Sequence, residues 1–364
     1  MTPTHQAWVL HSAQNIAFET TETLPPRNDE VQIAPRATGI CGTDQHYYQN
    51  GRNGIYEITE PLVLGHEAAG QVVAVGADVT NLKVGDSVAV EPQQACLNCR
   101  HCRTGSYNLC GKMRFNGSAS SKPPVQGSLQ ERFNHPARLV YPLPKTVSYE
   151  EGAMVEPLSV AVHSVRKANI QAGQTVLITG AGAIGLLCAS VAKVSGASRV
   201  AMVDVDEARL DFARQQGLAD STLIMPFGPA EGETSTEMTA RLAKDLVGEL
   251  PGPPDVSFEC TGVETCLNLC VHSNAPGGRV IVVGMGKPLQ TLSLGVALVR
   301  EIEVIGVWRY ANTFPTAISL LETRRVDVKP LVTHTFDLAQ AEEALKLVVA
   351  KPANLVKCLI TSST

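Results

Sequence analysis

The chain has 364 residues, of which 44% are hydrophobic and 18% charged, and its formal net charge is -5 at pH 7. The length predicts two domains, and the composition excludes a disordered chain. The acidic balance, without a basic stripe, excludes nucleic acid and anionic membranes as expected partners. No apolar run is long enough to span a bilayer and Met1–Gln14 has no signal-peptide pattern, so we expect a cytoplasmic protein.

Short apolar runs separated by turn residues mark the first part of the chain, to about residue 150. Val31–Ala34, Gly70–Val75 and Asp86–Val90 are such runs. Runs of this length between glycine, proline and aspartate are typical of short strands. Residues 1–150 are therefore predicted to form a barrel-like or irregular β domain.

Strands and helices alternate over residues 151–290. Apolar residues at helical spacing predict a helix over Glu150–Ala168. Beyond it we predict strands over Thr175–Thr179, Arg199–Val203, Asp255–Glu259 and Val280–Val283, and helices over Ile184–Val194 and Glu207–Gln216. This alternation predicts a parallel sheet with helices on both faces.

The alternation weakens from about residue 291. A strand is predicted over Ile302–Val307 and a helix over Ala339–Val349. We expect residues 291–364 to return to the first domain.

Gly180, Gly182 and Gly185 form a G-x-G-x-x-G pattern between a predicted buried strand and a predicted helix. In that context the glycines permit a tight turn and let a pyrophosphate approach the backbone. The helix N-terminus then offers unpaired N–H groups and partial positive charge. The pattern predicts a dinucleotide site.

Asp204 ends the next predicted strand, about 20 residues after the glycine turn. A carboxylate there accepts hydrogen bonds from the adenosine ribose and would repel a 2′-phosphate, which favours NAD over NADP. Asp206 is the better candidate for the cap of the following helix. Arg209 is expected to pack over the adenine.

Four of the ten cysteines, Cys96, Cys99, Cys102 and Cys110, form a C-x2-C-x2-C-x7-C cluster. Four thiolates at such spacing can close a tetrahedral zinc site. A bacterial iron–sulfur motif would place its fourth cysteine after three residues and follow it with proline. Here the gap is seven residues and Gly111 follows, so we predict a structural zinc.

Two further segments carry zinc-ligand chemistry. Cys41 opens the sequence Cys-Gly-Thr-Asp, and His66 and Glu67 follow Gly65. A thiolate, an imidazole and a carboxylate are all zinc ligands, although each alone is more often a packed core residue. The pairing of the two segments favours a metal site.

These two segments, the cysteine cluster and the glycine pattern together resemble the zinc-containing medium-chain dehydrogenases. The segment from Glu156 to His163 and the pair Arg309 and Tyr310 are similar, more narrowly, to the polyol branch: the sorbitol, xylitol and L-arabinitol dehydrogenases. The resemblance covers nearly the whole chain. It implies an α/β protein with a GroES-like catalytic domain built from both chain ends and a Rossmann domain between them.

The resemblance also implies residue roles. A catalytic zinc would be held by Cys41, His66 and Glu67, with Asp44 orienting His66 and Glu156 hydrogen-bonding the water at the metal. Contacts to NAD would come from the three pattern glycines and from Ile184, Asp204, Arg209, Val283, Gly284, Met285, Trp308, Arg309 and Tyr310.

For the proton released on oxidation, Thr43 and His46 match a relay of alcohol dehydrogenase relatives. Glu156 with water is a second route, and the sequence leaves both open. Tyr47, Glu156 and Arg309 are expected to hold the substrate. Because most relatives are tetramers or dimers, we expect a homo-oligomer, a tetramer or else a dimer.

The implied reaction is oxidation of a secondary hydroxyl of a polyol to a ketose, with hydride transfer to NAD. A dehydrogenase for L-threonine or another secondary alcohol, and a non-catalytic NAD-binding protein, are the alternatives. Asn53 stands where polyol relatives usually have isoleucine, and Asn116–Gln126 is longer and more polar than its counterparts. Both departures predict a more polar or wider substrate pocket.

Overall fold

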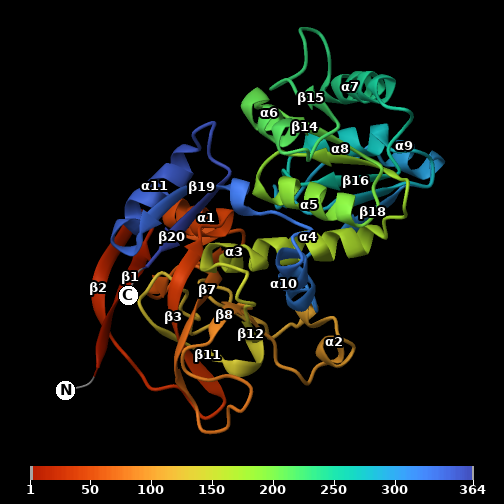
Figure 1. Cartoon of the computed structure of the whole chain (residues 1–364). Coiled ribbons are helices and arrows are strands. Elements are labelled where there is room, and N and C mark those ends of the chain that lie inside the picture. The colour runs from red at the N-terminus through yellow and green to blue at the C-terminus, as the bar shows by residue number, and fades with distance from the viewer. Residues whose placement is uncertain (1–2, 363–364) are drawn as a thin grey trace. The chain divides into compact units, whose positions relative to one another are not determined.

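The computed structural model describes residues 3–362. The chain divides into two compact units (Figure 1). Unit 1 contains the residues up to Pro157 together with those from Ala311 onwards, and unit 2 is Leu158–Tyr310. We predicted that the middle domain ends at residue 290, whereas unit 2 extends to Tyr310. The difference arises because the chain adds one more strand to the sheet of unit 2 before it returns to unit 1.

A seven-stranded sheet forms the centre of unit 1, with the order β12-β8-β7-β3-β20-β19 and β11 paired to β3. The central strand β3 (Glu30–Gly39) pairs antiparallel with three others, so it holds segments from distant parts of the chain together. Its partners and their neighbours are β7 (Glu67–Val75), β8 (Ser87–Val90), β11 (Phe133–Pro136), β12 (Val140–Pro142), β19 (Val332–Asp337) and β20 (Lys357–Thr361).

The other elements of unit 1 surround this sheet. A three-stranded sheet combines β1 (Thr4–Ser12), β2 (Asn15–Glu22) and β6 (Leu62–Val63). Two further two-stranded sheets pair β4 (Arg52–Asn53) with β5 (Tyr56–Glu57) and β9 (Gln93–Gln94) with β10 (Arg114–Phe115). The helices are α1 (Gly42–Asn50), α2 (Arg100–Arg103), α3 (Tyr149–Ala153), α10 (Phe314–Glu322) and α11 (Ala341–Ala350). Trp8, Tyr47 and Leu345 belong to one core cluster, so α1 and α11 pack on β1.

A six-stranded parallel sheet forms unit 2, in the order β15-β14-β13-β16-β17-β18. Numbered along the chain, this is the order 3-2-1-4-5-6 of a doubly wound dinucleotide-binding sheet. The strands are β13 (Thr175–Thr179), β14 (Arg199–Asp204), β15 (Ser221–Ile224), β16 (Val256–Glu259), β17 (Arg279–Val282) and β18 (Glu303–Gly306).

Helices cover both faces of this sheet. Right-handed crossovers place α5 (Ala183–Val194) and α6 (Glu207–Gln215) on one face, and α7 (Ser235–Glu249) and α8 (Glu264–Ser273) on the other. A short helix, α9 (Leu294–Val299), precedes β18. The parallel sheet with helices on both faces is thus confirmed, and Asp206 caps α6 as predicted, accepting from the N–H groups of Ala208 and Arg209.

The single helix predicted over Glu150–Ala168 is two helices, α3 and α4 (Val155–Ala168). Pro157 explains the break, since it has no N–H to bond the carbonyl of Ala153 and its ring would clash with that carbonyl. Glu156 therefore lies in the first turn of a new helix. Within residues 3–362, no helix is both long enough and apolar enough to cross a membrane.

His135, on β11, links two segments of unit 1 by hydrogen bonds, one at Glu91 and one at Asn116. Its Nε2 lies 2.9 Å from the carbonyl oxygen of Glu91, and its Nδ1 lies 3.4 Å from the side-chain nitrogen of Asn116. A carbonyl can only accept, so Nε2 carries the proton and Nδ1 accepts from the amide. Burial, reinforced by the charge of Arg138, lowers the pKa of His135 to about 4.

This buried imidazole predicts a pH-dependent stability. Between the ordinary pKa of 6.5 and the folded value of about 4, the unfolded chain binds the extra proton. The contribution of His135 to the free energy of unfolding is therefore complete above pH 6.5 and falls by about 3 kcal/mol as the pH drops toward 4. In His135→Gln, which keeps a donor but does not titrate, this part of the loss should be absent. Urea unfolding of both proteins at several pH values measures it, and parallel curves would contradict it.

Candidate active site

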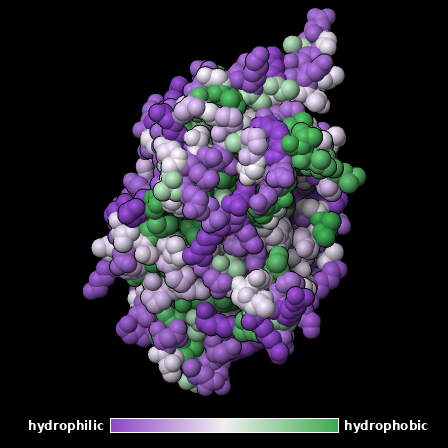
Figure 2. All heavy atoms as spheres, turned by 90° about the vertical axis from the view of Figure 1, so that its right-hand side faces the viewer, coloured by the Kyte–Doolittle hydropathy of each residue, from purple (hydrophilic) through white to green (hydrophobic). Residues whose placement is uncertain are grey.

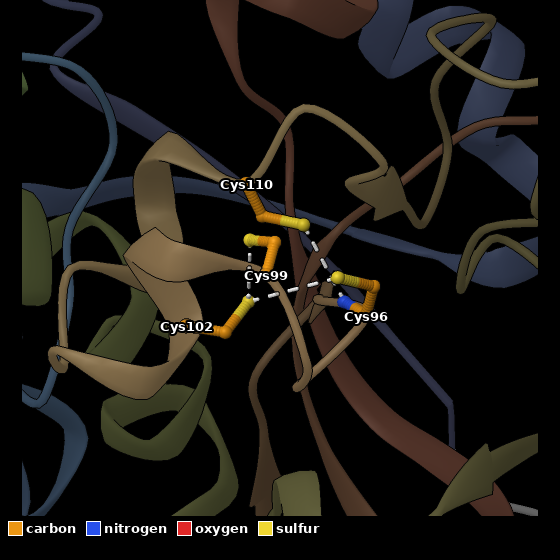
Figure 3. Close-up of side chains that lie close together, drawn as sticks. All are labelled: Cys96, Cys99, Cys102 and Cys110. Carbon is orange, nitrogen blue, oxygen red and sulfur yellow. Dashed lines mark hydrogen bonds between the residues drawn. The ribbon is translucent and has the colours of Figure 1, made fainter.

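The four clustered cysteines lie together in unit 1 and point their sulfurs at one centre (Figure 3). The sulfur of Cys102 lies 3.5 Å from that of Cys99 and 4.0 Å from that of Cys96. A tetrahedral zinc with bonds of about 2.3 Å separates its sulfurs by about 3.8 Å, so the cluster fits zinc without rearrangement. The Asn98 and Cys99 backbone N–H groups lower the pKa of Cys96 to about 6, which favours the thiolate that binds metal.

A second group of potential ligands brings Cys41, His66 and Glu67 together. Their ligand atoms lie within 4.8 Å of one another, and His66 and Glu67 are buried. The sheet explains the convergence: Cys41 follows the end of β3, and Glu67 begins β7 in register with Gly39. One sulfur, one nitrogen and one oxygen ligand leave a fourth tetrahedral position for water or substrate, the arrangement of a catalytic zinc site.

Asp44 holds the segments that carry these ligands in place. Its carboxylate accepts from the N–H groups of Cys41, at 2.9 Å, and Gly65, at 3.0 Å, and lies 3.6 Å from Nδ1 of His66. Burial alone would raise the pKa of Asp44, but the charge of His66 and these N–H donors bring it below its ordinary value. Burial would lower the pKa of His66, whereas Asp44 and Cys41 raise it well above its ordinary value. Asp44 therefore stays ionised and orients the imidazole, as the resemblance implied.

Lys357 is a member of the site that the sequence did not predict. It opens β20, is buried, and forms an ion pair with the carboxylate of Glu67. Burial would lower the pKa of this lysine, but the charges of Glu67, Cys41 and Glu156 raise it above its ordinary value. Because all three groups act on one ammonium group, Glu156 also lies within electrostatic reach of the three ligands.

The charges of the site fit a divalent cation. Around the ammonium group of Lys357, Cys41 as a thiolate, Glu67 and Glu156 carry three negative charges, so these four groups together have a formal charge of −2, apart from Asp44. Residual charge, donor set and burial all match Zn²⁺.

The glycine pattern of unit 2 has the geometry of a pyrophosphate cradle. Gly180 has a φ of +96°, in the left-handed region that favours glycine, and a side chain at Gly185 would collide with the carbonyl oxygen of Gly180. At Gly182, which precedes α5, an added Cβ would meet nothing within 4 Å. The turn, the open position and the tight helix–strand packing are the three roles that a dinucleotide fingerprint needs.

Asp204 is held at the edge of this cradle. One carboxylate oxygen accepts from the N–H of Ala181 at 2.6 Å, and the other accepts from the N–H of Asp206 at 3.0 Å. Arg209 lies 3.7 Å from the carboxylate of Asp206. The backbone thus fixes the acid that we predicted to meet the ribose, and its remaining lone pairs can still accept.

The sequence is similar to those of two families of known proteins. Residues 27–145 match the model of the alcohol dehydrogenase GroES-like domain, and residues 183–323 match that of the zinc-binding dehydrogenases. Sorbitol dehydrogenase of Gallus gallus is 40% identical, over 93% of this chain and 92% of that protein. L-idonate 5-dehydrogenase of Vitis vinifera is 39% identical, over 91% and 87%.

The chain belongs to the zinc-containing medium-chain dehydrogenases.

Solved structures agree with this assignment. An oxidoreductase of unknown specificity from Escherichia coli matches with a TM-score of 0.88 and 30% identity over the full length of both chains. A zinc-binding dehydrogenase of Sinorhizobium meliloti bound to NADP (TM-score 0.86, 27% identity, 99% of each chain) and an alcohol dehydrogenase of E. coli complexed with NADH (0.87, 25%, 98% of this chain and 99% of that one) also match.

The predicted fold of a medium-chain dehydrogenase, a GroES-like domain plus a Rossmann-type sheet, is therefore confirmed. The chain is a zinc-dependent oxidoreductase related to sorbitol and L-idonate dehydrogenases, with a four-cysteine site.

The residues predicted to hold the substrate have different surroundings. Tyr47 is fully buried, and its hydroxyl lies 3.1 Å from the Ser118 hydroxyl and accepts from the N–H of Ala119. Arg309 belongs to unit 2, where its guanidinium lies 5.0 Å from the ring centre of Trp308. Substrate contacts by either residue stay predictions. Tyr47 thus holds the loop at Ser118 and Ala119 against α1.

Other predicted nucleotide contacts belong to unit 2. Val283 and Gly284 donate their N–H groups to the carbonyl oxygen of Glu259. Ile184 and Met285 are partly or largely exposed, whereas Tyr310 is fully buried. Their contacts with a nucleotide stay predictions.

Phe115 is a further residue that the sequence analysis missed. Its buried ring packs edge-on against His66 with the ring centres 5.2 Å apart. It directly precedes the polar segment Asn116–Gln126, and no sequence signal links it to His66.

The Glu67–Lys357 pair generates a prediction about stability. In the metal-free protein, Lys357→Met leaves a buried carboxylate unpaired and should lower the free energy of unfolding by about 3–5 kcal/mol. Urea unfolding after chelation measures the loss. The double variant Lys357→Met with Glu67→Gln should recover most of it.

Lys346→Met is the matched control, because Lys346 pairs with Glu342 but is 60% exposed. Its loss should stay within about 1 kcal/mol. Equal losses in Lys346→Met and Lys357→Met would show that the buried pair contributes no more to the free energy of unfolding than an exposed pair does.

Proposed function

We propose that this enzyme oxidises a secondary hydroxyl of a polyol to a ketone, with NAD as the hydride acceptor. The observation that carries the proposal is the convergence of Cys41, His66 and Glu67, with Lys357 paired to Glu67. Similarity to sorbitol dehydrogenases over nearly the whole chain supports the same substrate class. When bound, zinc would act as a Lewis acid on the substrate oxygen, and NAD would accept the hydride.

In this proposal the protein supplies a fixed set of charges. Cys41, His66 and Glu67 hold the metal, and Asp44 keeps the imidazole of His66 in place. Lys357 keeps the Glu67 carboxylate in position and balances part of the negative charge. Because these side chains are already in place and largely buried, they need to move little when negative charge develops on the substrate oxygen.

The proton of the substrate hydroxyl needs a route to solvent. Thr43 and His46 lie three residues apart on α1, so both side chains belong to one face of that helix, and both are partly exposed. Glu156 is buried beside Lys357. We propose the route through Thr43 and His46, because a path to solvent requires exposed groups at its end.

A sugar acid is the second candidate substrate. L-idonate 5-dehydrogenase of V. vinifera is nearly as similar to this chain as the sorbitol dehydrogenases are. Asn53 and the loop around Ser118 add polar groups to unit 1 near α1, which suits a more polar ligand than sorbitol. Both candidates share the oxidation of a secondary hydroxyl.

The reaction is tested by rates of NADH formation with xylitol, sorbitol, L-arabinitol, galactitol, L-idonate, L-threonine and a simple secondary alcohol, each with NAD and NADP. We expect turnover of a polyol or sugar acid with NAD and little with NADP. Asp204→Ala should raise the KM for NAD by on the order of tenfold, through the lost ribose hydrogen bonds. Activity that survives zinc chelation, or robust activity with NADP, would contradict the proposal.

We also propose that the enzyme is a homo-oligomer. The terminal strand β18 leaves one edge of the sheet of unit 2 unpaired, and Leu294, Leu298, Val299 and Val304 beside it are exposed. Figure 2, which faces this end of the sheet, shows hydrophobic side chains gathered at the upper right. An unpaired edge with an apolar border suits antiparallel pairing with a second copy about a twofold axis.

Light-scattering mass measurements test the proposed oligomer. The wild type should have the mass of a dimer or tetramer. Leu298→Glu places a charge in the patch and should shift the mass toward the monomer. Phe227→Glu, at a residue that is 93% exposed and outside this group, is the matched control and should leave the mass unchanged. A monomeric wild type, or an unchanged mass in Leu298→Glu, would contradict this interface.

A further inference from the structure

Asn53 is buried against the two residues of the proposed proton route. Only 8% of the residue is exposed. Its side-chain oxygen lies 3.0 Å from Nδ1 of His46, and its side-chain nitrogen lies 3.4 Å from the hydroxyl oxygen of Thr43. One amide therefore bridges both members of the route.

The local fold explains this position. Helix α1 ends at Gly51, whose φ of +67° lets the chain reverse, and the hairpin of β4 and β5 follows at once. Asn53 lies on β4, so the reversal returns it to the helix face that carries Thr43 and His46.

The two hydrogen bonds have a fixed direction. The amide oxygen of Asn53 can only accept, so Nδ1 of His46 carries the proton and its Nε2 is left as the acceptor. The amide nitrogen can only donate, so the hydroxyl oxygen of Thr43 accepts from it and its proton points elsewhere. Thr43 is thus set to pass a proton on, and Nε2 of His46 is set to receive one.

We propose that Asn53 is the positioning residue of the proton route: it selects the Nδ1–H tautomer of His46 and aligns the Thr43 hydroxyl. The inference rests on the proposed function, since it assigns a task within that reaction. It also accounts for a buried amide at this position. A buried amide is costly unless it is hydrogen-bonded, and here both of its polar atoms have partners.

The first test observes His46 directly, without turnover. Nitrogen NMR of the histidine side chains distinguishes Nδ1–H from Nε2–H, and His46→Gln identifies the signal of His46 among the nine histidines. The wild type should show the Nδ1–H form. Asn53→Asp, which keeps the acceptor, should retain this form, whereas Asn53→Leu should lose it. Asn50→Leu, at an exposed residue at the end of α1, is the matched control and should retain it.

The second test uses the rate of polyol oxidation. In Asn53→Leu we expect kcat to fall by on the order of tenfold with little change in KM, because the proton transfer and not binding is affected. In a His46→Gln background the same change should cost less than in the wild type, because only the alignment of Thr43 is left to lose. A rise in KM with an unchanged tautomer would instead make Asn53 a substrate contact and overturn the inference.

The two tests separate the inference from the proposed function. If the wild type oxidises no polyol or sugar acid, the proposed function fails, while the NMR comparison still decides what Asn53 does to His46. If the wild type is active but His46 keeps its Nδ1–H form in Asn53→Leu, the inference fails and the proposed function stands.

Discussion

The buried ion pair between Glu67 and Lys357 is the constraint on which the rest of unit 1 depends. An unpaired charge in this interior would cost several kcal/mol, so both partners must reach the same place whenever the chain folds. Their strands flank β3: Glu67 pairs with Gly39, the last residue of β3, and β20, which begins at Lys357, pairs with β3 on the other side with Leu359 opposite Gly39. A side chain at Gly39 would lie 2.0 Å from the carboxylate of Glu67 and 3.0 Å from Cε of Lys357, which explains why glycine is needed there.

The same pair links the fold to the chemistry. Three segments far apart in sequence meet at the end of β3: the residues after β3 bring Cys41, β7 brings Glu67, and β20 brings Lys357. Without Lys357, the anionic groups of Cys41, Glu67 and Glu156 would lie near one another without a counter-charge. Their mutual repulsion would oppose folding before any metal binds. With Lys357, the remaining charge suits a single divalent cation. The lysine thus makes the site compatible with both the metal-free and the metal-bound protein.

The nucleotide elements of unit 2 are local in a way that the metal site is not. Gly180, Gly182, Gly185 and Asp204 fall within 25 consecutive residues, and a strand, a turn and a helix suffice to arrange them. The Asn53 bridge is local too, since one helix and one hairpin bring it to His46. Local arrangements of this kind can change from one relative to another without disturbing the central sheet. This suits residues that adjust proton transfer or specificity.

The sequence by itself determined most of unit 2 and the identity of the metal-ligand types. Buried parallel strands are continuous apolar runs, so β13 and β14 were found with nearly correct ends, and the cysteine spacing was sufficient for the four-sulfur site. The helix α7 was missed although Thr234 and Glu237 form a capping box at its start, because its apolar residues are spread over a largely polar segment.

Only the tertiary structure decided which residues form ion pairs and hydrogen bonds with the residues of the site. Lys357 is almost 300 residues from Glu67, and no spacing rule connects them, since their meeting depends on the register of two strands on β3. Asn53 was visible in the sequence as a departure, but its two partners were not, because hydrogen bonds of one amide depend on where a hairpin turns. Short-range geometry is encoded by neighbouring residues, whereas charge pairing across a sheet exists only once the sheet has formed.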